Sequence, residues 1–365
     1  MKRKGASRLA NSIRAPIRAL HHAAEPHIIP PTMIEENHPK TARALALISG
    51  GLDSQLAVCV LKEQGVHVEG ICFESPFFDS AKARRAAQQA GVELHVVDFT
   101  VDIAALLEHP RHGFGACMNP CIDCHLTMLR RAGERMTTMG FDFLVTGEVL
   151  NQRPMSQTPH NLEVVARESG YADLVLRPLC ARLLPETRPE REGWVDRGRL
   201  LDLNGRNRKP QLALAAKYGF KDIPTPAGGC LLTEPQFCGR VRDLRAHEGL
   251  ADPRDLRRLR WGRHFRLADR VKLILGRNRQ ENEWLEHDAN PEETVLCTVD
   301  VPGPTGVLSP GATEDQIQGA AAICVRYSDG RNAESAIVLV RQATGERQLN
   351  VAPARPEEEE KVRVS

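Results

Sequence analysis

Short apolar runs alternate with helically spaced segments from Arg43 to about Leu179. The runs predict buried strands, and apolar residues spaced three and four apart predict the helices between them. The predicted strands cover 44–48, 66–73, 92–99, 141–146 and 173–179, and the predicted helices 52–64, 80–90, 122–139 and 210–218, with an irregular insertion at 186–209. This order predicts an α/β fold with parallel strands and helical crossovers. Ligands in such sheets bind at the carboxyl ends of the strands, so the loops after Ile48, Phe73, Phe99 and Thr146 should face one crevice.

The pattern changes after residue 245. β-Branched, apolar runs at 271–275, 294–299 and 336–341 predict short strands. A charged helix is expected at 252–260, and an amphipathic helix capped by Thr313 at 313–327. These elements predict a small, separate α+β domain. We expect a basic arm at 1–40, an α/β domain at 41–245, a basic linker and α+β domain at 246–355, and a solvated acidic tail at 356–365.

The stretch Ser49-Gly50-Gly51-Leu52-Asp53-Ser54 lies between the first strand and the first helix. Glycines let the backbone turn tightly and approach a ligand, and a helix N-terminus presents free N–H groups to an anion such as pyrophosphate. No lysine follows, so the stretch is not a Walker loop. A serine-glycine turn without a ligand is the alternative.

The 365 residues carry a net charge of only +2, unevenly spread. Six Lys and Arg residues and no acid precede Glu25, which is typical of a mobile arm, a solvated extension or an organelle transit peptide. No apolar run reaches the roughly 18 residues of a membrane span, so we expect a soluble protein. Ten cysteines, three of them clustered, favour a reducing compartment such as the cytoplasm and metal or sulfur chemistry over disulfides.

The clustered cysteines belong to Cys117-Met-Asn-Pro-Cys121-Ile-Asp-Cys124-His125, and Cys230 follows a glycine pair much later. A helix start lowers thiol pKa values, and thiolates are both nucleophiles and metal ligands. Three interpretations stay open. Cys117, Cys121, Cys124 and His125 could hold structural zinc, two cysteines could carry a persulfide, or Cys121, Cys124 and Cys230 could hold an iron–sulfur cluster with one open iron.

Residues 49–54 closely resemble the PP-loop of the ATP pyrophosphatase superfamily. The resemblance implies an adenine nucleotide α-hydrolase-like fold that holds ATP phosphates while a substrate oxygen is adenylated and pyrophosphate leaves. The ATP-site residues it implies are Ser49, Gly50, Gly51, Asp53 and Ser54. Asp53 would help to organise the phosphates and Mg²⁺, and Phe73 and Gly147 would meet the nucleotide. The polar segment 148–157 should close over it, unless it is a plain surface loop.

Three further stretches, 119–125, 146–148 and 229–230, together resemble the tRNA-thiolating branch of the superfamily, close to 4-thiouridine synthetase catalytic domains and 2-thiouridylases. The resemblance covers about residues 43–245. The resemblance to cluster-dependent members implies that Cys121, Cys124 and Cys230 bind a [4Fe-4S] cluster and that these cysteines and Asp53 have the catalytic roles. The resemblance to members without a cluster implies instead that two cysteines act, Cys121 or Cys124 together with Cys230, one as the persulfide carrier and one as its partner. Cys117 has no clear counterpart in either group.

Residues 237–279 contain thirteen Arg or Lys and five Asp or Glu, with Trp261, His264 and Phe265 between them. Such a basic stretch with planar side chains favours RNA binding, and a solvated charged helix is the alternative. Residues 275–278, Asn282 and 300–304 also resemble the RNA-binding domain of NFACT proteins, over about 258–353. Cys297-Thr298-Val299 departs from that pattern.

We therefore expect an ATP-dependent tRNA sulfurtransferase that forms AMP and pyrophosphate, with 4-thiouridine favoured over 2-thiouridine. Its partners would be tRNA and a sulfur donor, either a cysteine desulfurase or sulfide, and a homodimer is one candidate assembly. A non-thiolating RNA-binding protein with structural zinc and an ATP-driven transferase for a small molecule are the alternatives.

Overall fold

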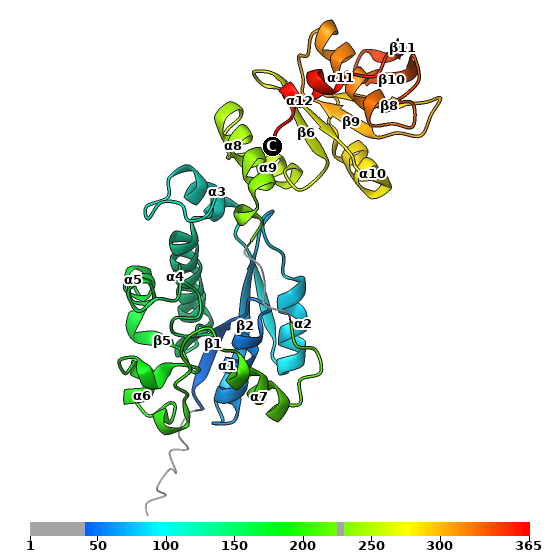
Figure 1. The fold of residues 1–365 in the computed structure, drawn as a ribbon. Helices are drawn as coiled ribbons and strands as arrows, with labels where there is room; N and C mark the ends of the chain where they lie inside the picture. The colour runs from blue at the N-terminus through cyan, green and yellow to red at the C-terminus, as the bar shows by residue number, and fades with distance from the viewer. Residues whose placement is uncertain (1–40, 225–229) are drawn as a thin grey trace, which may run out of the picture. The chain divides into compact units, whose positions relative to one another are not determined.

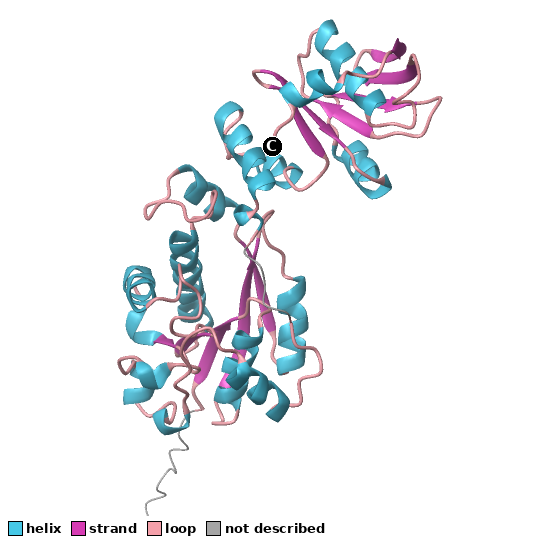
Figure 2. Cartoon of the chain, viewed as in Figure 1, coloured by secondary structure: helices cyan, strands magenta, loops and turns pink. Residues whose placement is uncertain are grey.

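The computed structural model describes residues 41–224 and 230–365. The arm predicted for residues 1–40 lies outside the described residues, as do the glycines before Cys230. Figures 1 and 2 show two separate sheets with their helices. In the described residues, no helix is long and apolar enough to cross a membrane.

The first sheet is parallel throughout, in the order β3-β2-β1-β4-β5 (Figure 1). Its strands are β1 Arg43–Leu47, β2 His67–Glu74, β3 Leu94–Asp98, β4 Phe143–Thr146 and β5 Val175–Leu176. The central strand is β1, where Leu47 pairs with both Ile71 and Thr146. This arrangement confirms the predicted α/β fold, although the last strand is shorter than expected.

Helices cover both faces of this sheet. One layer contains α1 Leu52–Lys62, α2 Ala81–Ala90 and α7 Lys209–Lys217, and the other α3 Thr100–Glu108, α4 Cys121–Met139 and α5 Pro159–Ser169. Successive strand residues point to opposite faces, so Ala44, Ala46 and Ile48 join the core under α1 and α2. Leu45 joins the second core with Leu129 of α4. The carboxyl edge is thus held rigidly from both sides.

Several helices of this domain were not predicted, among them α3 and α5. Helix α5 begins at Thr158, whose hydroxyl accepts a hydrogen bond from the Asn161 N–H, with Pro159 at the first helical position. In front of α3, the Asp98 carboxylate accepts from the Thr100 N–H. The insertion 186–209 contains the short helix α6 Arg188–Arg191. The 3₁₀ helices are η1 Ala172–Leu174, η2 Ala181–Leu183, η3 Arg197–Arg199 and η4 Leu231–Thr233.

The second sheet is antiparallel, in the order β11-β10-β8-β9-β7-β6. Its strands are β6 Arg263–Ala268, β7 Val271–Leu275, β8 Thr294–Thr298, β9 Thr305–Leu308, β10 Ala336–Gln342 and β11 Gly345–Val351. The nearby helices are α8 Pro235–His247, α9 Pro253–Arg258, α10 Arg279–Asp288 and α11 Glu314–Arg326. Leu285 of α10 packs on Ile274 and Val307, whereas α11 packs into the core with Leu273 and Val338. The predicted α+β character is confirmed.

The acidic end differs from the expected solvated tail. Residues Pro356–Val362 form helix α12. Glu357, Glu358 and Glu360 are exposed, but Glu359 is buried and accepts a hydrogen bond from the Tyr327 hydroxyl at 2.7 Å. A run of four glutamates reads as solvated from its charge alone, yet one position in each helical turn can face a core.

Candidate active site

A pocket of about 300 Å³ lies at the carboxyl ends of the parallel strands. Its lining includes most of the expected nucleotide residues, namely Ser49, Gly51, Asp53, Ser54, Phe73 and Gly147. Phe78, Met128 and Leu129 give it an apolar part, while Arg153 and Gln157 come from the polar segment after β4. The polar segment predicted to close over the nucleotide therefore does face the pocket.

Gly50 does not line the pocket but shapes the loop. Its backbone has a φ of +82°, and a Cβ there would lie 2.5 Å from the Cβ of Lys82 at the start of α2. At Gly147, a Cβ would overlap the backbone nitrogen of Ser54. Both glycines are needed because neighbouring backbone passes so close.

The carboxylate of Asp53 contacts the same polar segment that follows β4. Gln152 Nε2 donates to its Oδ2 at 2.6 Å, while its Oδ1 is buried without a partner among the described residues. Burial raises the pKa of Asp53, against the opposing effects of Gln152, Arg208, Arg153 and Gln211. The two arginines place positive charge beside the loop, as anionic phosphates require, and no local pattern in the sequence pointed to Arg208.

The three predicted sulfur-site cysteines come from two segments. Cys121 is the first residue of α4, Cys124 lies one turn later, and Cys230 directly precedes η4. Burial and the negative charges of Cys230 and Cys121 raise the pKa of Cys124 well above its usual value. Burial and Cys121 also raise the pKa of Cys230. The three thiols thus oppose one another's ionisation, which a shared cationic group would relieve. Among the described residues, however, their sulfur atoms do not all lie within 4.8 Å of one another.

His125, which is partly exposed, and the buried Glu148 form a pair between the cysteines and the pocket. His125 Nδ1 lies 3.6 Å from Glu148 Oε1, and Arg177 Nε lies 2.9 Å from Glu148 Oε2. The Thr146 hydroxyl donates to the same carboxylate at 2.9 Å. Both Glu148 and Arg177 are less than one-tenth exposed, so their charges are screened little by water.

This pair controls the charge beside Cys121. Although burial opposes both charges, Arg177 and His125 lower the pKa of Glu148 to about 2. At His125, burial lowers the pKa, but hydrogen bonds to Cys121 and Glu148 have the larger combined effect and raise it to about 10. Against burial, His125 and Ser156 lower the pKa of Cys121. The arrangement favours a thiolate at Cys121 next to an imidazolium, and the sequence did not identify Arg177 as its anchor.

Cys117 is directed elsewhere. It has a φ of +58°, and its Sγ lies 3.8 Å from the carbonyl oxygen of Thr233, close to the buried Cys238. His125 is occupied with Cys121 and Glu148. In the described part of the chain, Cys117, Cys121, Cys124 and His125 thus do not converge on one point, which removes the geometry expected of the zinc alternative.

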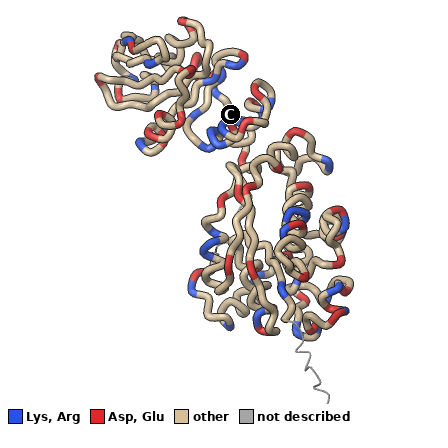
Figure 3. Tube along the Cα trace, turned by 180° about the vertical axis from the view of Figure 1, so that it is seen from behind, with Lys and Arg blue, Asp and Glu red and all other residues tan. Residues whose placement is uncertain are grey.

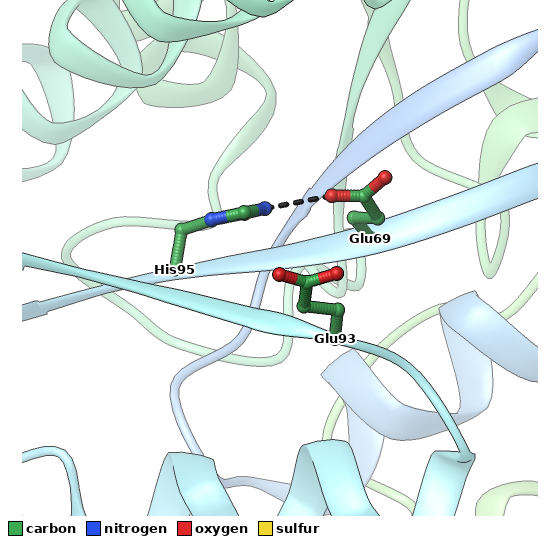
Figure 4. Close-up of side chains that lie close together, drawn as sticks. All are labelled: Glu69, Glu93 and His95. Atoms are coloured by element: carbon green, nitrogen blue, oxygen red, sulfur yellow. Dashed lines mark hydrogen bonds and ion pairs between the residues drawn. The ribbon is translucent and has the colours of Figure 1, made fainter.

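A second group of possible ligands lies at the opposite, amino end of the strands. The donor atoms of Glu69, Glu93 and His95 all lie within 4.8 Å of one another (Figure 4). Glu69 already accepts hydrogen bonds from His95 at 2.7 Å, His67 at 3.0 Å and Arg43 at 3.3 Å. We interpret this group as an ion-pair network on the sheet face.

The basic stretch 237–279 is largely neutralised by carboxylates. Eight of its cations form ion pairs: Arg245, Arg254, Arg258, Arg260, Arg266, Lys272, Arg277 and Arg279. Figure 3 shows acidic and basic positions mixed along this part of the chain. His264 and Phe265 are buried and unable to stack on bases, so that expectation was wrong for them. Trp261 is partly exposed and stacks on Trp284, with ring centroids 4.8 Å apart.

Comparisons with known proteins match both domains. Residues 40–182 match the family described as thiamine biosynthesis protein (ThiI), and residues 262–363 match the NFACT protein RNA binding domain. The tRNA-specific 2-thiouridylase MnmA of Marinobacter nauticus is 30% identical over 137 residues, 33% of this chain and 35% of that protein. MnmA 1 of Syntrophus aciditrophicus is 31% identical over 121 residues, 29% and 32% of the two chains.

Among solved structures, a 4-thiouridine synthetase–RNA complex with bound ATP is 26% identical, with a TM-score of 0.32. The match covers 38% of this chain and 36% of that chain. The chain spans about a third of the length of the curated relatives it matches. The family matches confirm the resemblance drawn from the motifs: residues 40–182 are similar to the ThiI family, and residues 262–363 to the RNA binding domain of NFACT proteins.

Proposed function

We propose that this protein is an ATP-dependent sulfurtransferase that thiolates a uridine of tRNA. The observation that carries the proposal is that one pocket is lined both by the phosphate loop and by residues next to a cysteine. Ser49, Gly51, Asp53 and Ser54 of the PP-loop line one side. His125 and Glu148, next to Cys121, line another. An activating nucleotide and a sulfur-bearing group could therefore meet at one substrate atom.

The first step activates the base. The uridine carbonyl oxygen attacks the α-phosphorus of ATP, pyrophosphate leaves, and the oxygen becomes part of a good leaving group. N–H groups at the start of α1 and the charges of Arg153 and Arg208 suit the phosphates. Asp53, whose Oδ1 has no partner among the described residues, suits a phosphate-bound Mg²⁺. Phe73 and Phe78 offer an apolar surface for adenine.

The second step replaces that oxygen with sulfur. Sulfur attacks the activated carbon and AMP leaves with the former carbonyl oxygen. Cys121, Cys124 and Cys230 would hold a [4Fe-4S] cluster, since their mutual repulsion as thiolates calls for a bound cation. When bound, such a cluster would supply an iron that can take extra sulfide. His125 keeps a positive charge beside Cys121, and Glu148 and Arg177 hold the imidazole in place. A persulfide on two of the cysteines is the competing route.

The tRNA and the sulfur donor are the proposed partners. The NFACT-type domain would hold the RNA, with exposed cations such as Arg242, Arg257 and Arg270 available for phosphates. We favour 4-thiouridine over 2-thiouridine as the product, sulfide or a cysteine desulfurase as the sulfur source, and the cytoplasm as the compartment.

Anaerobically purified protein provides the first test. We expect a brown protein with iron and acid-labile sulfide, and loss of both in Cys121→Ala, Cys124→Ala and Cys230→Ala. Cys297→Ala, in the other domain, is the matched control and should keep its colour. Colourless protein with zinc that depends on Cys117 or His125 would contradict the cluster, and metal-free protein would favour the persulfide.

Thiolation is tested with tRNA transcripts, ATP and sulfide, followed by nucleoside mass spectrometry. Cys230→Ala should lose thiolation while its ATP affinity stays within about twofold, because Cys230 does not line the nucleotide pocket. Retained thiolation in this variant would rule out its assigned role.

A further inference from the structure

A segment outside the matched thiolation region reaches the residues that support Asp53 in the pocket wall. Residues 204–211 dock against the segment that follows β4, more than fifty positions earlier. Gly205 N donates to the Leu150 carbonyl oxygen at 2.7 Å, and Asn151 Nδ2 donates to Asn204 Oδ1 at 2.9 Å. Two bonds therefore fix residues 204 and 205, which lead into α7, beside the segment that follows β4.

Gln211 is the residue of this segment that faces inward. Its side chain is 1% exposed, and its Nε2 donates to Gln152 Oε1 at 3.1 Å. Gln152 Nε2 in turn donates to Asp53 Oδ2 at 2.6 Å. A carboxylate only accepts hydrogen bonds, so the amide nitrogen of Gln152 must face Asp53. Its oxygen is then left for the Gln211 nitrogen, which gives the chain of bonds a single direction.

Two atoms of this chain lack partners. Asp53 Oδ1 and Gln211 Oε1 are both buried and have no hydrogen-bond partner among the described residues. Buried polar atoms are normally satisfied, so an orphaned carboxylate oxygen beside a phosphate loop points to a bound group. Long amide side chains also have many rotamers, and Gln152 keeps one of them because both of its ends are bonded.

We propose that Gln211 is a positioning residue for the ATP site: it fixes Gln152, which holds the Asp53 carboxylate with Oδ1 free for the cation on the phosphates. The inference rests on the proposed function, because it assumes that ATP binds at this loop with a divalent cation. It extends that function to a residue of α7 that touches neither nucleotide nor cysteine.

The test compares ATP affinity with and without Mg²⁺ by calorimetry on the full chain. In the wild type, Mg²⁺ should tighten ATP binding. Gln211→Leu should reduce this Mg²⁺-dependent gain about fivefold, the usual effect of losing a hydrogen bond between neutral side chains. Gln211→Glu keeps the shape but cannot donate as a carboxylate, so it should lose at least as much. In a Gln152→Leu background, Gln211→Leu should add less than it does alone, because most of its effect passes through Gln152 and only a smaller part acts directly on Asp53.

Gln89→Leu is the matched control. Gln89 Nε2 donates to Gln55 Oε1 at 2.8 Å, so this variant also removes a bond between two glutamines, and this bond does not lead to Asp53. The variant loses in addition the bonds of Gln89 to the Asp222 backbone, so its stability loss is an upper bound for the comparison. Urea unfolding places both variants on one stability scale. A normal Mg²⁺-dependent gain in Gln211→Leu, with a stability loss like that of Gln89→Leu, would overturn the inference alone. A wild type that does not bind ATP would overturn the proposed function as well.

Discussion

The two ends of the parallel sheet carry similar residues in different surroundings. At the carboxyl end, Glu148 and Arg177 are buried beside Cys121, and the His125 side chain is 34% exposed. At the amino end, the Glu69 side chain is 14% exposed and contacts His95 (Figure 4). It also contacts Arg43 and His67, which is about half exposed, and the neighbouring Glu93 is exposed. Both ends contain His–Glu contacts of 2.7 to 3.6 Å. The difference teaches that short distances between ligating groups do not identify a site; an adjoining pocket, which His125 and Glu148 line, does.

The largest expected effect comes from breaking the enclosed end. Glu148→Gln leaves Arg177 and His125 buried without their counter-charge, so we expect a loss of about 3–5 kcal/mol in the free energy of unfolding. Urea denaturation at pH 7 measures it. A loss below 1 kcal/mol would show that the charges at this end are as well solvated as those at the other.

Gly50, before α1, and Gly65, before β2, allow the same kind of comparison for the backbone: similar conformations in different surroundings. Gly50 and Gly65 have nearly equal φ values of +82° and +83°, but a Cβ at Gly65 would meet nothing within 4 Å. We expect Gly65→Ala to cost about 1 kcal/mol from its backbone conformation alone, and Gly50→Ala about 2–3 kcal/mol because α2 must also move. Thermal unfolding of the two variants decides, and equal losses would contradict the close approach of α2.

The pH dependence of stability should separate the two ends further. The pKa of His125 is raised to about 10 in the folded protein, so its stabilising contribution is complete below about pH 6.5 and is lost as the pH rises toward 10. The stability difference between wild type and His125→Asn should therefore shrink by about 1–2 kcal/mol between pH 6.5 and 9.5. A difference that grows over this range would contradict the buried imidazolium.

The smallest effect is expected at the amino end. The Glu69 side chain is only 14% exposed, but its partners His67 and Arg43 are 52% and 36% exposed. These partners can turn to water in Glu69→Gln, so we expect a loss of no more than about 1 kcal/mol. That loss should fall further in 1 M salt, which screens exposed charges. Urea unfolding at low and high salt measures both, and a large, salt-independent loss would place this network in the same class as Glu148.

Local sequence patterns were sufficient to predict the phosphate loop and the cysteine pair of the site, but not the residues that hold them in place from distant segments. The strand–loop–helix at 43–62 and the cysteine pair opening α4 follow from apolar spacing and glycine placement. Arg177, Arg208 and Gln211 reach the site from segments far along the chain, and no spacing in the sequence links them to it. The neutralisation of the basic stretch 237–279 was missed for the same reason. Acids such as Glu293, which pairs with Arg258, lie outside the stretch in the sequence.

The bond from Gln211 to Gln152 crosses the end of the matched thiolation region at residue 182. A truncated protein ending there would keep the phosphate loop and Cys121 but lose the support of Gln152, the docking of Leu150 and the third cysteine. We expect such a fragment to bind nucleotide poorly, even with its signature motifs intact. The segment that matches the family and the segment that completes the site thus have different boundaries in this chain.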